Sequence, residues 1–267
     1  MATHEEKWPA GTPCWVDVSV SDLASSQAFY TSVLGWEFEE SSAEYGGYTN
    51  AHLGGRRVAG MSPPMEGMDW PTVWSTYFAT DDVEATAAAA TGAGAQQIFA
   101  PMDVGAFGRM AMWTDAGGVP FGAWESREHT GFDAHNEHGA VAWIDLVSGA
   151  LEDSKSFYGT VFGFTYEDTP VEGFEYTMFT PPGADRPAGG MGLAQPDDAL
   201  GPRWCVTFEV DDVDAARQRV VDAGGAAPTE PWDFEYGRVA TVKGLDGEEF
   251  SLMTSKPFDE VPAPGEG

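Results

Sequence analysis

Two tryptophan–aspartate pairs are the residues of this sequence best suited to chemistry. Trp15 and Asp17 stand two residues apart in CWVDVSV, and Trp143 and Asp145 repeat that spacing in AWIDLVS. Residues two apart on a strand project from the same face, so each pair would set an indole ring beside a carboxylate. Such a pair could hold a flat or cationic organic molecule, or could use its carboxylate as a general base.

Alternation along the other predicted strands adds further residues to each pair, and Tyr48 and Tyr176 are strand residues predicted to lie at the edges of the two sites. Asp17 and Asp145 are the candidate catalytic residues. The candidate ligand-binding residues are Trp15, Tyr48, Ser75, Tyr77, Arg109, Trp124, Trp143, Tyr176, Cys205, Thr207, Arg238 and Met253. Two simpler interpretations stay open: the tryptophans plug sites that bind nothing, or the aspartates are buried ion-pair partners of Arg109 and Arg238.

An internal repeat supplies the elements that must position these side chains. CWVDVSVSDLASSQAFYTSVLGWEFEE returns 128 residues later as AWIDLVSGALEDSKSFYGTVFGFTYED. Each half contains, twice over, a strand, a helix with an aspartate near its start, and a set of short strands. Strand alternation over residues 14–20 and an apolar helical stripe ending at Gly35 are typical of these units. We therefore predict four βαβββ units arranged as two tandem domains.

The repeat also sets the predicted domain boundaries. We expect a tail over 1–10, a first domain over 11–127, a linker over 128–137, a second domain over 138–256 and a tail over 257–267. Tyr30 and Tyr158 follow helix-core phenylalanines and are predicted to pack in the core. His4, His129, His135 and His138 fall at the N-terminus or in the linker and are predicted to be solvated; His52 is predicted to be a hairpin residue.

The first half has a strand followed by Asp-Leu, a helix ending in Ala-Phe-Tyr, and then Val-Leu-Gly-Trp. The second half repeats the last two motifs as Phe-Tyr and Phe-Gly-Phe. This pattern resembles the vicinal oxygen chelate superfamily. That group includes glyoxalase I, extradiol dioxygenases, fosfomycin-resistance enzymes and bleomycin-resistance proteins. The opening GTPCWVDV and YTNAHLGGRRVAGM resemble actinobacterial tandem proteins described as glyoxalase-like. Over residues 11–256 the resemblance implies an α+β fold in which four βαβββ units form two cup-shaped eight-stranded sheets.

The resemblance also implies positions for the ligands of a divalent metal ion. In this sequence the positions that can be carried over fall on Trp15, Ser75 and Gly122 in the first half, and on Trp143, Cys205 and Ser251 in the second. Indole, glycine and serine side chains do not replace imidazole and carboxylate around such an ion. We therefore predict no metal and no other cofactor.

Composition narrows the choice of partners and location. The net charge of −30 opposes binding to nucleic acid or to an anionic membrane surface. The sequence has neither a secretory signal pattern nor an apolar run of membrane-spanning length, so we expect a cytoplasmic protein. Two cysteines are too few for a disulfide framework. We expect a small-molecule ligand and a monomer or homodimer.

These observations favour one function and leave two alternatives. The favoured one is metal-independent binding of an aromatic or cationic metabolite or antibiotic, as in bleomycin-resistance proteins. The second is a glyoxalase-like enzyme, a lyase, hydroxylase or isomerase, that acts on an activated carbonyl or polyketide-like substrate with Asp17 or Asp145 as base. The third is a scaffold whose acidic surface recruits a basic protein.

Overall fold

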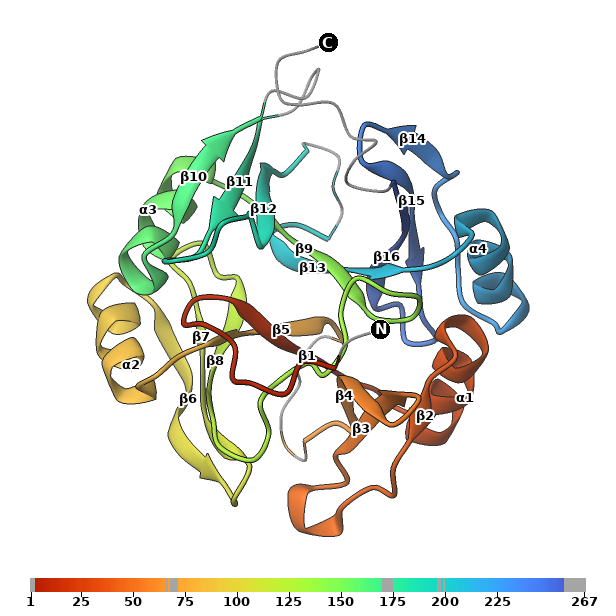
Figure 1. The fold of residues 1–267 in the computed structure, drawn as a ribbon, viewed down its shortest axis with the longest axis horizontal. Helices are drawn as coiled ribbons and strands as arrows, with labels where there is room; N and C mark the ends of the chain where they lie inside the picture. Colours follow the sequence, from red (N-terminus) through yellow and green to blue (C-terminus); the bar gives the residue numbers. More distant parts are fainter. Residues whose placement is uncertain are drawn as a thin grey trace. The chain divides into compact units, whose positions relative to one another are not determined.

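The computed structural model describes residues 3–65, 67, 72–169, 175–195, 198 and 200–256 (Figure 1). The first half runs β1 (Pro13–Ser19), α1 (Leu23–Leu34), β2 (Glu37–Phe38), a short 3₁₀ helix (Ala43–Tyr45), β3 (Thr49–Leu53), β4 (Arg56–Ser62), β5 (Trp74–Ala79), α2 (Val83–Gly92), β6 (Gln96–Val104), β7 (Gly108–Thr114) and β8 (Pro120–Ser126). The second half repeats this order with β9 (Val141–Ser148), α3 (Leu151–Phe162), β10 (Thr165–Asp168), β11 (Tyr176–Thr180), β12 (Gly189–Leu193), β13 (Arg203–Glu209), α4 (Val213–Asp222), β14 (Trp232–Phe234), β15 (Gly237–Lys243) and β16 (Glu249–Ser255).

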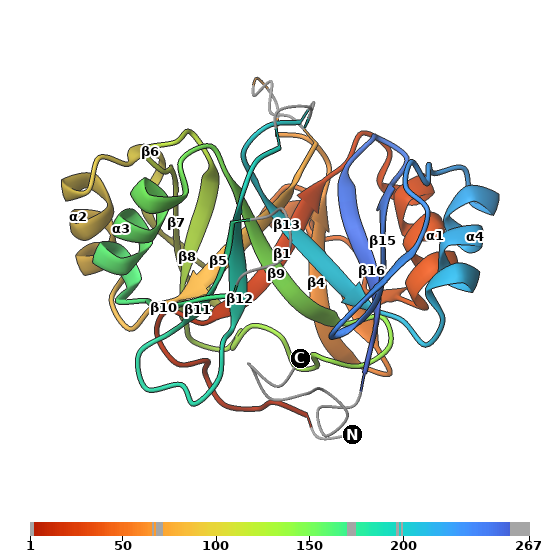
Figure 2. The ribbon, with the colours of Figure 1, turned by 90° about the horizontal axis from the view of Figure 1, so that it is seen from above.

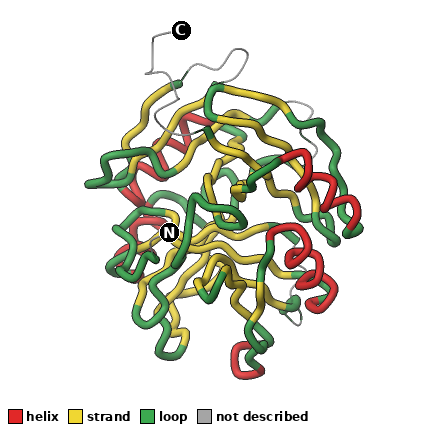
Figure 3. The backbone as a smooth tube through the Cα atoms, turned by 45° about the vertical axis from the view of Figure 1, so that its right-hand side comes forward, coloured by secondary structure: helices red, strands yellow, loops and turns green. Residues whose placement is uncertain are grey.

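The strands form two eight-stranded sheets of the same topology. Their orders are β2-β3-β4-β1-β5-β8-β7-β6 and β10-β11-β12-β9-β13-β16-β15-β14. Neighbours joined by hairpins are antiparallel, whereas β5 with β8, β12 with β9, and β13 with β16 are parallel pairs. Helix α2 packs against β6, β7 and β8, and α4 packs against β15 and β16; Figure 3 shows the helices in red and the strands in yellow. The predicted α+β fold of four βαβββ units in tandem is confirmed.

Local sequence explains where the helices begin and end. Asp22, Asp82 and Asp212 cap α1, α2 and α4 by accepting backbone N–H groups of the first turn. Gly35 and Gly163 end α1 and α3 in the left-handed conformation, with φ of 76° and 73°. The four helices have ten or twelve residues. Within the described ranges, no helix is long and apolar enough to cross a membrane.

The chain packs into two compact units that do not coincide with the two repeats. Unit 1 comprises Met1–Asp17, Ser75–Asp133 and Trp143–Cys205, and unit 2 comprises Val18–Trp74, Ala134–Ala142 and Val206–Gly267. Each unit therefore combines a βαβββ segment of the first half with one of the second. The helices α2 and α3 pack together in unit 1, and α1 and α4 pack together in unit 2 (Figure 2).

A buried tyrosine joins the two halves inside each unit. In unit 1 the Tyr158 hydroxyl donates to Asp115 Oδ2 over 3.0 Å and accepts from the Trp204 indole over 3.0 Å. In unit 2 the Tyr30 hydroxyl donates to Glu248 Oε1 over 2.8 Å. Both tyrosines are fully buried, so the prediction that they pack in the core is confirmed. Burial raises the pKa of each tyrosine and of each carboxyl partner.

Candidate functional site

Three polar side chains predicted from the sequence converge in unit 1. Trp143 and Asp145 lie on β9 and Tyr176 lies on β11. The Tyr176 hydroxyl donates to Asp145 Oδ1 over 2.8 Å, and the Trp143 indole N–H lies 3.0 Å from the same oxygen and 3.0 Å from Tyr176 Oη. We call these three residues the Asp145 site. All three residues are half-buried.

A glycine on the intervening strand makes this convergence possible. Gly190 on β12 is the register partner of Asp145 on one side and of Met178 on the other. A Cβ atom at Gly190 would lie 1.9 Å from Tyr176 Oη and 2.6 Å from Asp145 Oδ1. Any side chain at this position would occupy the space through which the Tyr176 hydroxyl reaches Asp145.

The electrostatics of the Asp145 site suit proton exchange near neutral pH. Burial raises the pKa of Asp145 from 3.8 to about 6, against the hydrogen bonds from Tyr176 and Trp143, which lower it. Both hydrogen bonds go to Oδ1, and Oδ2 accepts none from the described residues. Asp145 can therefore use Oδ2 either to accept a hydrogen bond or to take up a proton.

The raised pKa predicts that Asp145→Asn stabilises the protein at alkaline pH. Above pH of about 6 the carboxyl is ionised in both states, and the folded state alone bears the cost of burying the charge; below about pH 4 both states are protonated. The contribution of the Asp145 carboxyl to the free energy of unfolding therefore falls as the pH rises from about 4 to about 6. We expect Asp145→Asn to raise the free energy of unfolding by about 1–2 kcal/mol at about pH 8, discounted for partial exposure, and to change it little at about pH 4.

Urea unfolding of both proteins at the two pH values measures this effect, because the asparagine amide oxygen still accepts from Tyr176 and Trp143. Asp168→Asn is the matched control: Lys155 lowers the pKa of Asp168, so this exposed substitution should act in the opposite direction and weakly. Destabilisation by Asp145→Asn at alkaline pH would contradict the expectation.

The first-half pair is arranged differently. Trp15 is only 6% exposed, and its ring meets the His129 ring edge-on with centroids 4.4 Å apart. His129 also lies 5.5 Å from the Trp124 ring, and the Trp124 indole donates to the His129 carbonyl over 2.7 Å. Trp15 and Trp124 are thus brought to one place, as predicted, but around a histidine that belongs to the predicted linker.

The prediction that His129 is solvated is wrong, since its residue is only 8% exposed. The cause is the pinning of its segment: the His129 N–H donates to the Phe107 carbonyl over 3.0 Å, and the Phe132 N–H donates to the Cys14 carbonyl over 2.9 Å. Because the backbone is held at both of these points, the imidazole ring of His129 is turned toward the interior. The aromatic and glycine residues of REHTGF were the available signal for a packed segment.

Tyr77 occupies the space beside Gly122. These two residues are register partners on the parallel strands β5 and β8. A Cβ at Gly122 would lie 2.2 Å from the Tyr77 ring, and the Tyr77 hydroxyl lies 3.4 Å from Met112 Sδ. The position to which the resemblance assigns a metal-binding carboxylate is therefore filled by a neighbouring aromatic ring.

The residues at the remaining inherited ligand positions do not fit a divalent metal ion either. Ser75 and Cys205, which forms no disulfide, are half-buried, and Ser251 pairs in register with Thr207. No three His, Cys, Asp or Glu side chains gather into a group that could hold a metal, as far as the described residues go. The donor set thus differs from that of metal-binding members of the resembled superfamily.

Arg109 and Arg238 form ion pairs with acidic residues at the starts of two helices. Arg109 pairs with Glu84 at the start of α2 over 2.7 Å, and Arg238 pairs with Asp214 at the start of α4 over 2.8 Å. Neither pairs with a candidate aspartate, so the interpretation of Asp17 and Asp145 as their ion-pair partners is wrong. Both arginines lie on the helix side of their strands, which is opposite to the face on which a partner of Asp17 or Asp145 would have to lie.

The remaining candidates occupy separate places. Asp17 is half-buried on β1 in unit 1. In unit 2, Thr207 is buried on β13 and Met253 pairs with Val239 on β15. Tyr48 pairs with Ser42 just before β3 begins. These residues are therefore not part of the Asp145 site as the hydrogen bonds define it.

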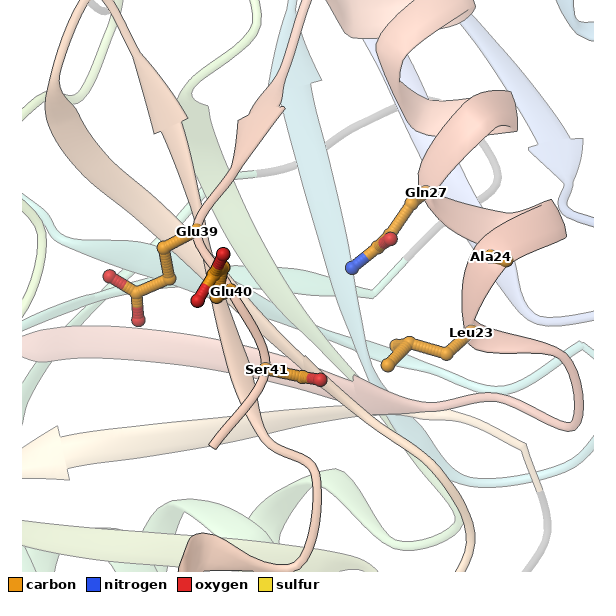
Figure 4. A pocket seen from close by; sticks show the side chains of 6 residues that line it. All are labelled: Leu23, Ala24, Gln27, Glu39, Glu40 and Ser41. Carbon is orange, nitrogen blue, oxygen red and sulfur yellow. The ribbon is translucent and has the colours of Figure 1, made fainter. Parts of the chain in front are cut away.

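Two surface hollows in unit 2 contain none of the Asp145 site. One of about 540 Å³ lies between α1 and the segment after β2, where Gln27 points toward Glu40 (Figure 4). Glu39, on its wall, is already bonded to Asn50 and lies 3.4 Å from His52. The other, about 430 Å³, lies at the start of α4 beside Arg238. None of the described residues that line either hollow is aromatic, so neither hollow offers a ring for stacking.

Comparisons with known proteins place this arrangement in a family. The chain is 33% identical over 255 residues to a Mycobacterium tuberculosis protein provisionally named glyoxylase CFP32, with 92% of this chain and 96% of the relative covered. It is 31% identical over 261 residues to the anthracycline biosynthesis protein DnrV of Streptomyces peucetius, with 92% and 94% covered. The Mn(II)-bound glyoxalase from Novosphingobium aromaticivorans shares the fold, with a TM-score of 0.67, 19% identity, and coverage of 96% of this chain and 88% of that one.

The family model of the Glyoxalase/Bleomycin resistance protein/Dioxygenase superfamily matches twice, at residues 14–122 and 140–252. The two matches fall on the two repeats and contain the elements that carry Trp15 and the Asp145 site. This chain belongs to the Glyoxalase/Bleomycin resistance protein/Dioxygenase superfamily.

Proposed function

We propose that this chain binds a flat aromatic small molecule at the Asp145 site without the help of a metal ion. The convergence of an indole ring, a phenol and a carboxylate on one face carries this proposal. Half-buried Trp143 and Tyr176 offer faces for stacking, and Asp145 Oδ2 offers an acceptor for a ligand hydroxyl. The donor set at the inherited metal positions supports a metal-independent mode.

The names of two relatives suggest the class of ligand. DnrV and DauV are both named as anthracycline biosynthesis proteins, and anthracyclines are flat fused-ring molecules that bear phenolic hydroxyls. A phenolic hydroxyl beside Asp145 would donate to Oδ2, and the fused rings would stack on Trp143. We therefore propose a hydroxylated polycyclic aromatic ligand of the polyketide type.

Calorimetric titration with a dihydroxyanthraquinone tests this function. We expect saturable binding that weakens by about 30-fold or more in Trp143→Ala, because an indole at the centre of a site carries a large share of the binding energy. Asp145→Asn should weaken binding by about 10-fold or more through loss of the charge-assisted hydrogen bond. Calorimetry avoids any dependence of the signal on tryptophan fluorescence.

Trp232→Ala is the matched control, since Trp232 is 54% exposed on β14 in unit 2 and should be indifferent. Binding that is equally strong in all three variants would exclude the Asp145 site. Binding that disappears on treatment with a chelator, and returns with a divalent ion, would exclude the metal-independent mode.

A second candidate function is proton transfer by Asp145. The unoccupied Oδ2 and the pKa of about 6 favour it, because a base that titrates near the working pH can take a proton from a carbon activated by an adjacent carbonyl. The same titrations distinguish the two functions when the ligand is recovered and weighed. An unchanged ligand supports the binding protein, and a chelator-insensitive product absent in Asp145→Asn supports the enzyme.

A further inference from the structure

We infer that His129 occupies, from within the chain, a binding site for a flat nitrogen heterocycle between Trp15 and Trp124. The imidazole stands edge-on to both indoles, at interplanar angles of 86° and 73° and centroid distances of 4.4 Å and 5.5 Å. Edge-to-face contact at such distances is a favoured arrangement of aromatic rings. This inference concerns unit 1 alone and goes beyond the function proposed for the Asp145 site.

A backbone hydrogen bond makes this site specific for a ring with an accepting nitrogen, in addition to selecting a flat shape. The Gly131 N–H donates to His129 Nδ1 over 3.1 Å, so the imidazole accepts at Nδ1 and carries its proton on Nε2. The donor is fixed in place because Gly131 has φ of 108° and a Cβ there would lie 2.4 Å from the Cys14 carbonyl oxygen. An occupant of this site must therefore be flat and present a ring nitrogen that accepts in the ring plane.

The segment around His129 is anchored on both sides, which keeps the site closed in the wild-type protein. The Trp8 indole donates to the Phe132 carbonyl over 3.2 Å, and His4 stacks on Trp8 with centroids 4.0 Å apart. The Phe132 ring in turn lies 5.5 Å from the Trp15 ring. Replacement of the His129 side chain alone should thus leave its backbone in place and open a hole of imidazole shape.

Chemical rescue tests this inference. We expect His129→Ala to lower the Tm by roughly 4–8 °C, and imidazole at millimolar concentration to restore at least half of that loss. Wild-type protein should not respond to imidazole. Pyrrole has the same shape but no accepting ring nitrogen, so it should restore much less. Trp15→Ala combined with His129→Ala should abolish imidazole binding.

Equal rescue by pyrrole would overturn the role of the Gly131 N–H, and a folded His129→Ala protein that binds no imidazole would overturn the site itself. A measurement on the wild-type chain covers the case in which the variant fails to fold. The ¹⁵N chemical shifts of the His129 ring should show Nδ1 without a proton, and a proton on Nδ1 would overturn the inference. Because none of these readouts involves Asp145, their failure is separate from failure of the proposed function.

Discussion

Gly190→Ala is expected to abolish binding at the Asp145 site and to lower the free energy of unfolding by about 2–3 kcal/mol. The added methyl group would lie 1.9 Å from Tyr176 Oη and 2.6 Å from Asp145 Oδ1, far inside van der Waals contact. The Tyr176 hydroxyl is the nearest atom and stands at the far end of a long side chain, so the Tyr176 ring is the group that must move. Its displacement breaks the hydrogen bond to Asp145 and leaves the half-buried carboxylate with one donor fewer.

Gly192→Ala, two residues along β12, is the matched control. A Cβ at Gly192 would lie 3.5 Å from the Tyr176 ring, an ordinary contact distance. We expect this variant to bind like the wild type and to change stability by less than about 1 kcal/mol. Urea unfolding and titration with a dihydroxyanthraquinone measure both properties on both variants.

Two results would contradict this view of Gly190. Normal binding by Gly190→Ala would show that the Tyr176 hydroxyl has no part in the site. Equal losses in Gly190→Ala and Gly192→Ala would show that β12 is sensitive to any added side chain, so that the contact with Tyr176 has no special weight. Recovery of stability when Gly190→Ala is combined with Tyr176→Ala would confirm the source of the strain, because this change removes both the hydroxyl oxygen at 1.9 Å and the ring carbon Cζ at 2.3 Å.

Strand alternation accounts for only part of the Asp145 site. Trp143 and Asp145 lie two apart on one strand, so a period of two sets them on one face. Tyr176 was a candidate only as a residue of a predicted strand, and its place beside Asp145 depends on how β11, β12 and β9 pair. The register that sets Gly190 beside Asp145 does not follow from a single sequence. Nothing in a strand pattern indicates which cross-strand neighbour is a glycine.

Strand alternation could not predict which residues surround Trp15. His129 comes from a segment without periodicity, and its burial depends on hydrogen bonds from Phe132 to Cys14 and from His129 to Phe107. These bonds join residues far apart in the sequence. The partners of Tyr30 and Tyr158 were hidden for the same reason, because each hydroxyl bonds to a carboxylate of the other repeat.

Asp115→Ala is expected to destabilise unit 1 by about 3–5 kcal/mol, more than most single substitutions. Asp115 is 4% exposed, and its carboxylate accepts from the backbone N–H groups of Gly117 and Val119 over 2.9 Å as well as from the Tyr158 hydroxyl. Removal of the carboxylate leaves three donors without their acceptor. The Val119 N–H and the Tyr158 hydroxyl are buried, whereas the Gly117 N–H belongs to an exposed residue and can bond to water. Each buried donor that loses its acceptor costs about 1–3 kcal/mol.

A double-mutant cycle with Tyr158→Phe apportions this loss between the turn and the contact that joins the two repeats. Tyr158→Phe removes the hydroxyl that bonds both Asp115 and Trp204, so we expect about 2–3 kcal/mol of loss by itself and a coupling of at least about 1 kcal/mol with Asp115→Ala. Asp103→Ala, at a carboxylate that is 62% exposed, should cost less than about 0.5 kcal/mol. Strict additivity in the cycle would mean that Asp115 stabilises only its own turn; coupling would show that the bond between Tyr158 and Asp115 holds the first-half and second-half segments of unit 1 together.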